Sequence, residues 1–234
     1  MIAITNSLIL IASAILVLGA CTAVVFRLRD HLVRGLAAAI TLLILLEIAD
    51  LFVLDHLTAA FSIGLRGALE EVLRAALFAS VLAGFRPFHI ALLAAVLISV
   101  IESAPWLGPI LYAALFAIAA APETVQITTT GPSALVLTGG WFEATMPAFA
   151  VGLRVALHAF LGFASILAFR HQNWGALFVC ACLHAGHNLT VTLVASEEHS
   201  PLMSVATALP SAAVVIAGCA FLARRLKGAG TTNA

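Results

Sequence analysis

Long apolar runs fill most of this chain and constrain its fold more than any other feature. A membrane-spanning helix needs about 20 mostly apolar residues, and six runs reach or approach that length. These runs are Ile4–Phe26, Leu36–Leu54, Ala59–Phe85, Phe142–Phe169, Trp174–Ala195 and Met203–Leu222. Of the 234 residues, 63% are apolar and 9% are charged, whereas soluble domains have about 45–50% and about 25%. We therefore predict an all-α polytopic membrane protein, with residues 1–234 forming a single transmembrane domain.

The number of crossings depends on the stretch Pro87–Ala121, whose interior contains Glu102, Pro105 and Pro109. Basic residues favour the cytoplasmic side of a membrane. They cluster after the first run and in the C-terminal tail, at Arg27, Arg29, Arg34, Arg224, Arg225 and Lys227. This bias predicts an outside N-terminus and a cytoplasmic C-terminus, and therefore an odd number of crossings. We expect a bundle of seven to eight transmembrane helices, with seven favoured and Pro87–Ala121 broken.

The third apolar run contains Glu70, Glu71 and Arg74. A charge at bilayer depth costs about 2.5–3.5 kcal/mol on insertion scales, so such residues persist when they are paired, lie in a polar cavity or take part in chemistry. The spacing of three and four residues lets Arg74 pair with either carboxylate. If Arg74 holds one carboxylate, the other is free to take up a proton, as a general base requires.

Further polar residues lie at a similar depth in three other runs. His184 shares a helix face with His187 and Asn188, since they are three and four residues apart. His158 lies on the preceding run, and a short loop near Arg170 joins the two, so antiparallel packing could bring His158 and His184 together. With a rise of about 1.5 Å per residue, Glu71, Arg74, Glu102, His158 and His184 lie roughly 15–21 Å from the nearest predicted helix end.

Each polar residue also has a purely structural explanation. A membrane histidine often makes only a helix–helix hydrogen bond, Glu47 could pair with Arg154, and Asp50 could reach water at the end of its run. A Cys/His metal cluster at Cys180 and His184 is disfavoured, because Cys182 would point the opposite way. Structural roles do not readily explain the whole set of membrane carboxylates, histidines and Arg74 together, so a functional site is favoured.

The order of these motifs resembles the CPBP superfamily of intramembrane proteases. That group includes the type II CAAX prenyl endopeptidases and the PrsW-type proteases. The resemblance rests on Glu70-Glu71-x-x-Arg74, then His158, then His184-Ala-Gly-His-Asn188, and it covers a core of about residues 59–195. The spacing of the first motif is closer to the PrsW form, and Glu102 resembles a glutamate of that form. The chain departs from the CAAX form at Arg154, where that form has an aromatic residue.

The resemblance implies hydrolysis of a peptide bond in a membrane protein or lipidated peptide. Glu70 or Glu71 would activate a water, with Glu70 favoured and Arg74 in support. His158 and His184 would hold the water directly or through a divalent metal, and Asn188 would stabilise the oxyanion. Two histidines and a carboxylate suit zinc, and Glu102 and His187 would help to bind that cofactor. A prokaryotic-type plasma membrane is the expected location.

Two other classes of function remain open from the sequence. A haem-binding membrane protein could use His158 with His184 or His187 as axial ligands, although this leaves the double glutamate unexplained. A proton-coupled transporter could use the acidic residues as a relay. The net charge of zero argues against a nucleic-acid partner.

Overall fold

The computed structural model describes residues 2–119, 139–195 and 201–230, and this part of the chain is helical with no strands. The predicted all-α membrane fold is therefore confirmed. The longer helices are α1 (Ile2–Arg27), α2 (Leu32–Phe52), α3 (Ala59–Val81), α4 (Pro87–Ala119), α6 (Trp141–Arg170), α7 (Trp174–Ala195) and α8 (Pro201–Gly230). Two 3-10 turns, Arg29–His31 and Leu54–His56, follow α1 and α2. The polar sequence Pro122–Trp141 predicts a loop, and most of this stretch lies outside the described residues.

Six helical segments in the described residues are long and apolar enough to cross a bilayer, and they lie on α1, α2, α4, α6, α7 and α8. The chain is thus a multi-pass integral membrane protein. The α3 helix falls outside this group because it carries four charged residues, which are Arg66, Glu70, Glu71 and Arg74. The number of crossings and the cytoplasmic side of the C-terminus stay predictions.

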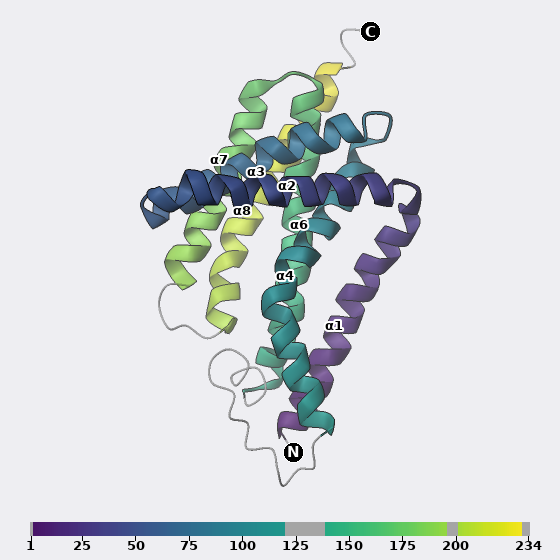
Figure 1. Cartoon of the computed structure of the whole chain (residues 1–234), viewed down its shortest axis with the longest axis vertical. Coiled ribbons are helices and arrows are strands. Elements are labelled where there is room, and N and C mark those ends of the chain that lie inside the picture. The colour runs from purple at the N-terminus through teal and green to yellow at the C-terminus, as the bar shows by residue number, and fades with distance from the viewer. Residues whose placement is uncertain (1, 120–138, 196–200, 231–234) are drawn as a thin grey trace.

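The helices do not form a simple up-and-down bundle. In Figure 1, α4 and α6 run along the long axis, α7 and α8 lie to one side of them, and α2 lies across the others. The helix pairs with the most extensive contacts are α4 with α6, α3 with α7, and α6 with α8. Since α3 also packs against α6, its polar face meets residues from both α6 and α7.

The stretch that we expected to be broken is a single helix. Pro105 and Pro109 both lie inside α4, so the expected interruption of Pro87–Ala121 is wrong. A proline removes one helical hydrogen bond, but neighbouring protein can compensate at membrane depth. Here α1 and α6 pack along α4, and Leu10 of α1 joins Ile110 and Ala114 of α4 in a buried apolar cluster.

Arg170, the last residue of α6, fixes the end of α3. Its guanidinium donates hydrogen bonds to the carbonyl oxygens of Leu82, Ala83 and Phe85 at 3.1, 3.0 and 2.9 Å. The last carbonyls of a helix have no partner within that helix. By satisfying the carbonyls around the end of α3, Arg170 holds α3 at a defined depth against α6.

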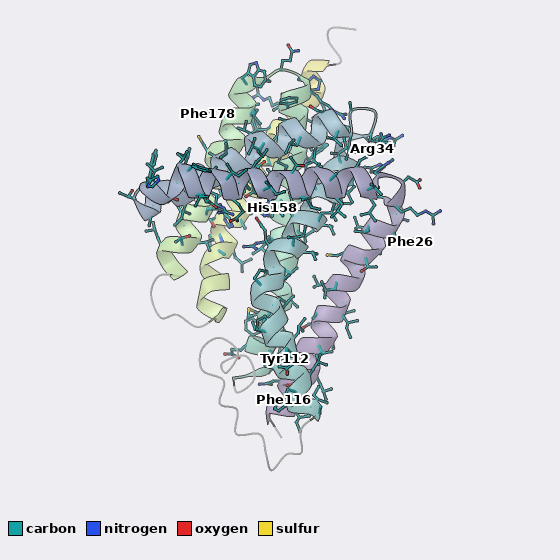
Figure 2. All side chains as sticks on the ribbon, viewed as in Figure 1. Phe26, Arg34, Tyr112, Phe116, His158 and Phe178 are labelled. Carbon is teal, nitrogen blue, oxygen red and sulfur yellow. The ribbon has the colours of Figure 1, made fainter. Side chains whose placement is uncertain are left out.

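Apolar side chains cover the outside of the bundle. Phe26, Tyr112, Phe116 and Phe178 are 68%, 72%, 58% and 69% exposed, and Figure 2 shows them at the periphery. His158 lies among the helices in the same view and is buried. An apolar exterior around a polar centre suits a protein surrounded by lipid.

Candidate functional site

Arg74 lies at the centre of the polar cluster on α3. Its guanidinium pairs with the carboxylates of both Glu70 and Glu71, one turn away on the same helix. All three residues are buried. The helical spacing predicted pairing with either glutamate, and the structure has both. Arg74 therefore compensates two carboxylates with one permanent positive charge.

The same guanidinium reaches the histidine of α6. Arg74 Nη2 lies 2.7 Å from His158 Nδ1. Because a guanidinium can only donate, Nδ1 of His158 must be the acceptor and its hydrogen must lie on Nε2. That Nε2–H is 3.8 Å from Glu102 Oε2 on α4. His158 is thus neutral with its hydrogen on Nε2, and it lies between Arg74 of α3 and Glu102 of α4.

His184 of α7 lies between the two carboxylates of α3. Its Nε2 is 3.8 Å from Glu70 Oε2, and its Nδ1 is 3.0 Å from Glu71 Oε1, although the second contact lacks hydrogen-bond geometry. The rings of His158 and His184 meet edge to face, with centroids 5.4 Å apart. The prediction that α6 and α7 bring these histidines together is confirmed.

The cluster has the composition of a metal site. Glu70, Glu71, His158 and His184 are all buried, and each offers a donor atom within 4.8 Å of the others. Carboxylate oxygens and imidazole nitrogens are ligands that zinc accepts. Within the described ranges of the chain, these four side chains could hold a metal ion.

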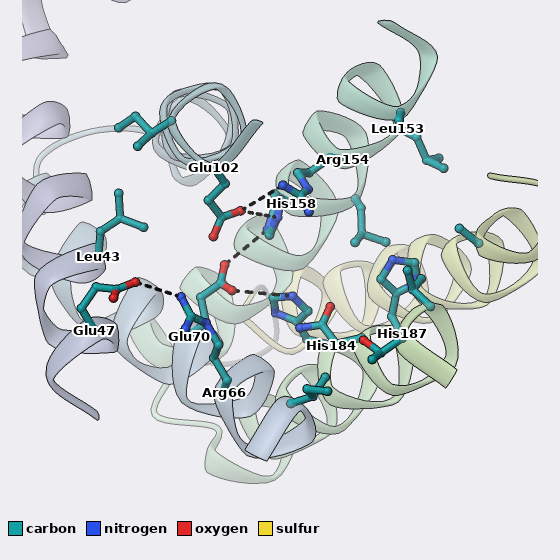
Figure 3. Close-up of a pocket in the computed structure, with 18 residues that line it drawn as sticks. Leu43, Glu47, Arg66, Glu70, Glu102, Leu153, Arg154, His158, His184 and His187 are labelled. Atoms are coloured by element: carbon teal, nitrogen blue, oxygen red, sulfur yellow. Dashed lines mark hydrogen bonds and ion pairs between the residues drawn. The ribbon is translucent and has the colours of Figure 1, made fainter. Parts of the chain in front are cut away.

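A cavity of about 740 Å³ opens beside the cluster, lined by residues from α2, α3, α4, α6, α7 and α8. Glu70, Glu102, His158, His184, His187 and Asn188 all line this cavity (Figure 3). Glu71 and Arg74 do not line it and are fully buried. The predicted site residues thus divide into a group facing the cavity and a buried pair that supports it.

Two further arginines line the cavity, and their partners differ from our expectation. Glu47 pairs with Arg66 at 3.4 Å and not with Arg154, and Asp50 also pairs with Arg66 and does not simply reach water. Arg154 lies 3.7 Å from Glu102 instead. The sequence pattern could not indicate these pairs, because it does not show that Glu47 of α2 and Arg154 of α6 lie on different sides of the cavity.

The predicted residue His187 has a partner on α8 that the sequence did not reveal. His187 Nδ1 lies 2.8 Å from Ser211 Oγ, and that hydroxyl donates to the carbonyl of Ala208 at 3.0 Å. Since the hydroxyl hydrogen is used there, His187 donates from Nδ1 and keeps its Nε2 lone pair. Ser211 lies 24 residues from His187, so no local spacing could have indicated this contact.

The close approach of α3 and α7 depends on Gly67. A Cβ atom added to Gly67 would lie 2.8 Å from Asn188 Nδ2 and 3.3 Å from the backbone nitrogen of Ala185. We expect Gly67→Ala to push the helices apart and lower the free energy of unfolding by about 1–3 kcal/mol. Thermal unfolding in detergent measures this change.

Gly186 is the matched control on α7, because a Cβ atom added there meets nothing within 4 Å. Gly186→Ala should leave stability unchanged or raise it by up to about 1 kcal/mol, since alanine favours helix. Equal unfolding temperatures for the two variants would contradict the tight α3–α7 contact.

We compared the chain with known proteins, and no protein-family model, curated protein or solved structure matches it.

Proposed function

We propose that this chain is an intramembrane endopeptidase of the CPBP type. The observation that carries the proposal is the position of Glu70. Its carboxylate faces a cavity within a membrane bundle, is held by Arg74, and lies 3.6 Å and 3.8 Å from a nitrogen of His158 and His184. A general base needs a fixed carboxylate with access to water and substrate. Glu71 lacks that access because it is fully buried and does not line the cavity.

In the proposed mechanism, Glu70 takes a proton from a water molecule in the cavity. The resulting hydroxide attacks the carbonyl carbon of the scissile peptide bond. The side-chain amide of Asn188, which lines the same cavity, donates a hydrogen bond to the developing oxyanion. When the C–N bond breaks, Glu70 returns its proton to the leaving amine. The products are a new carboxylate and a new amine.

The supporting residues hold this arrangement in place. Arg74 binds both carboxylates and His158, so it fixes Glu70 relative to α6. Glu71 lies beside Nδ1 of His184 and helps to orient that ring toward Glu70. Reacting groups must be held in place for efficient catalysis, and three helices contribute to that here.

Zinc fits this site only in part. Glu71 Oε2 and His184 Nδ1 are buried without a hydrogen-bond partner, and a cation could satisfy such atoms. However, His158 has a single lone pair, and Arg74 already uses it. The positive guanidinium would also lie directly beside the ion and repel it. We therefore propose that the carboxylate of Glu70 activates the water without a metal.

Removing metal should accordingly leave cleavage intact. After treatment of the purified protein with a strong chelator, we expect the cleavage rate to stay within twofold of the untreated value. Elemental analysis should find well under one zinc per chain. Loss of activity on chelation, with recovery on adding zinc, would contradict the metal-free mechanism while supporting hydrolysis at this site.

The haem alternative that pairs His158 with His184 does not suit the geometry. The rings of His158 and His184 are edge to face with centroids 5.4 Å apart, and the carboxylate of Glu70 lies against both. This arrangement leaves no room for a macrocycle between the two rings.

The proposal can be tested with the purified protein in detergent. A mixture of synthetic single-span membrane peptides would be incubated with the wild type and with His184→Ala, and the products identified by mass spectrometry. We expect defined cleavage products from the wild type and at least a hundredfold less from His184→Ala. His171→Ala is the matched control, because His171 is exposed at the end of α6. Equal cleavage by wild type and His184→Ala would refute the proposal.

A further inference from the structure

The cavity region contains three arginines, and two of them each pair with two carboxylates. Arg66 pairs with Glu47 and Asp50. Arg74 pairs with Glu70 and Glu71 and donates to His158. Unlike carboxylates, which can take up a proton, arginine stays charged in proteins. Each of these two arginines has enough acceptors around it to balance that permanent charge.

Arg154 is different. Its one charged partner in the described part of the chain is Glu102, and Nη1 lies 3.7 Å from Glu102 Oε2, which is beyond hydrogen-bond distance. The same oxygen also faces Nε2 of His158 at 3.8 Å. A guanidinium has five N–H donors, and no other acceptor in the described residues contacts this one. Among the described residues, the edge formed by Nη2 and Nε therefore has no acceptor.

This edge of Arg154 lies at membrane depth and beside the cavity. It lies near the middle of α6, a candidate membrane span, and its side chain is 40% exposed. Because Arg154 lines the cavity, its donors are accessible from the cavity (Figure 3). A charged residue at this depth is generally paired, or it binds the molecule that enters. The preferred partner of a guanidinium edge is a planar carboxylate, which it binds with two parallel hydrogen bonds.

We propose that Arg154 binds a carboxylate of the substrate and so selects peptides with a negative charge close to the scissile bond. This inference rests on the proposed function. Arg154 is one helical turn before His158, which places their Cβ atoms about 5–6 Å apart. An extended peptide rises about 3.3 Å per residue. His158 Nδ1 in turn lies 3.6 Å from Glu70 Oε1, so the selected carboxylate lies within a few residues of the bond that is cleaved.

A carboxylate fits this place better than a lipid phosphate does. Lipid headgroups lie at the membrane surface, whereas Arg154 lies near the middle of its helix. The carboxylate can come from an acidic side chain or from the free C-terminus of a peptide, and the experiment separates these sources.

The test measures binding in the Glu70→Gln background, which does not require cleavage. Three fluorescent apolar peptides would be titrated: one with a central Glu and blocked termini, one with Gln in its place, and one with Gln and a free C-terminal carboxylate. We expect the Glu peptide, the free-carboxylate peptide or both to bind at least tenfold more tightly than the blocked Gln peptide. Whichever acidic peptide binds more tightly identifies the source of the carboxylate.

Adding Arg154→Gln to this background should remove the preference for acidic peptides. The affinity for the blocked Gln peptide should stay unchanged, and this result would show that the cavity is intact. Arg154→Lys should keep part of the preference, because it keeps the charge. Arg34→Gln is the control, since Arg34 is exposed on α2 and does not line the cavity. Equal affinity for all three peptides, or a preference that survives Arg154→Gln, would overturn the inference. If the Glu70→Gln protein prefers an acidic peptide but the wild type cleaves none of the peptides, the proposed protease activity is contradicted and the proposed role of Arg154 in binding a carboxylate is not.

Discussion

Glu70→Gln is expected to abolish peptide cleavage while leaving the helical bundle folded. Glutamine has nearly the same shape as glutamate and can still accept a hydrogen bond from Arg74, but it cannot take a proton from water. Removal of a general base typically lowers a rate by about 10²–10⁴-fold. Because Glu70 lines the cavity and carries the proposed chemistry, we expect a loss toward the upper end of that range.

A loss of cleavage in Glu70→Gln must be distinguished from a loss of the folded structure. Rates would be measured in detergent on the same peptide mixture for the wild type, Glu70→Gln and the control Glu143→Gln. Glu143 lies in the first turn of α6, outside the cavity, so this control should cleave at the wild-type rate. Unfolding temperatures show whether each variant is intact. A folded Glu70→Gln protein that retains more than a tenth of the wild-type rate would contradict the assigned role.

Arg74→Met is expected to destabilise the helical bundle more than Gly67→Ala does. Arg74 is fully buried and contacts the carboxylates of Glu70 and Glu71 as well as His158. Removing one partner from a buried charge network leaves uncompensated charge, which typically costs about 3–5 kcal/mol. Chemical or thermal unfolding of the detergent-solubilised protein measures the loss.

The triple variant Glu70→Gln, Glu71→Gln and Arg74→Met provides the control for that prediction. Replacing a whole buried ionic network is often neutral, because the desolvation of every charge is avoided. We therefore expect the triple variant to regain most of the stability lost by Arg74→Met, although it stays inactive. If the triple variant is as unstable as the single one, then packing rather than charge explains the role of Arg74.

The main features of the fold could be predicted from the sequence, because apolar length is a local property. Most helix ends lie within a few residues of the predicted runs, and α7 has the predicted bounds, Trp174–Ala195. However, α8 continues past the predicted end at Leu222 to Gly230. The other exception is α4, where Pro105 and Pro109 suggested a break. Packing by α1 and α6 along this helix is a tertiary effect that no local pattern indicates.

The sequence predicted those features of the site that depend on helical spacing and on the order of the helices along the chain. Glu70, Glu71 and Arg74 lie within one turn of each other, and a short loop joins the helices of His158 and His184. The hydrogen bond from Arg74 to His158 spans 84 residues and depends on side-chain conformation. The partners of Glu47, Arg154 and His187 were missed for the same reason, since each depends on how distant helices pack.

The central claim is that water is added across a peptide bond in the cavity beside Glu70, and one measurement tests it directly. The peptide mixture would be incubated with the wild type in ¹⁸O-labelled water, and the new C-terminal fragments analysed by mass spectrometry. We predict that each new C-terminal carboxylate carries one ¹⁸O atom and that Glu70→Gln yields at most about a hundredth of these fragments. Absence of labelled fragments from the folded wild type, or equal amounts from both proteins, would contradict the account.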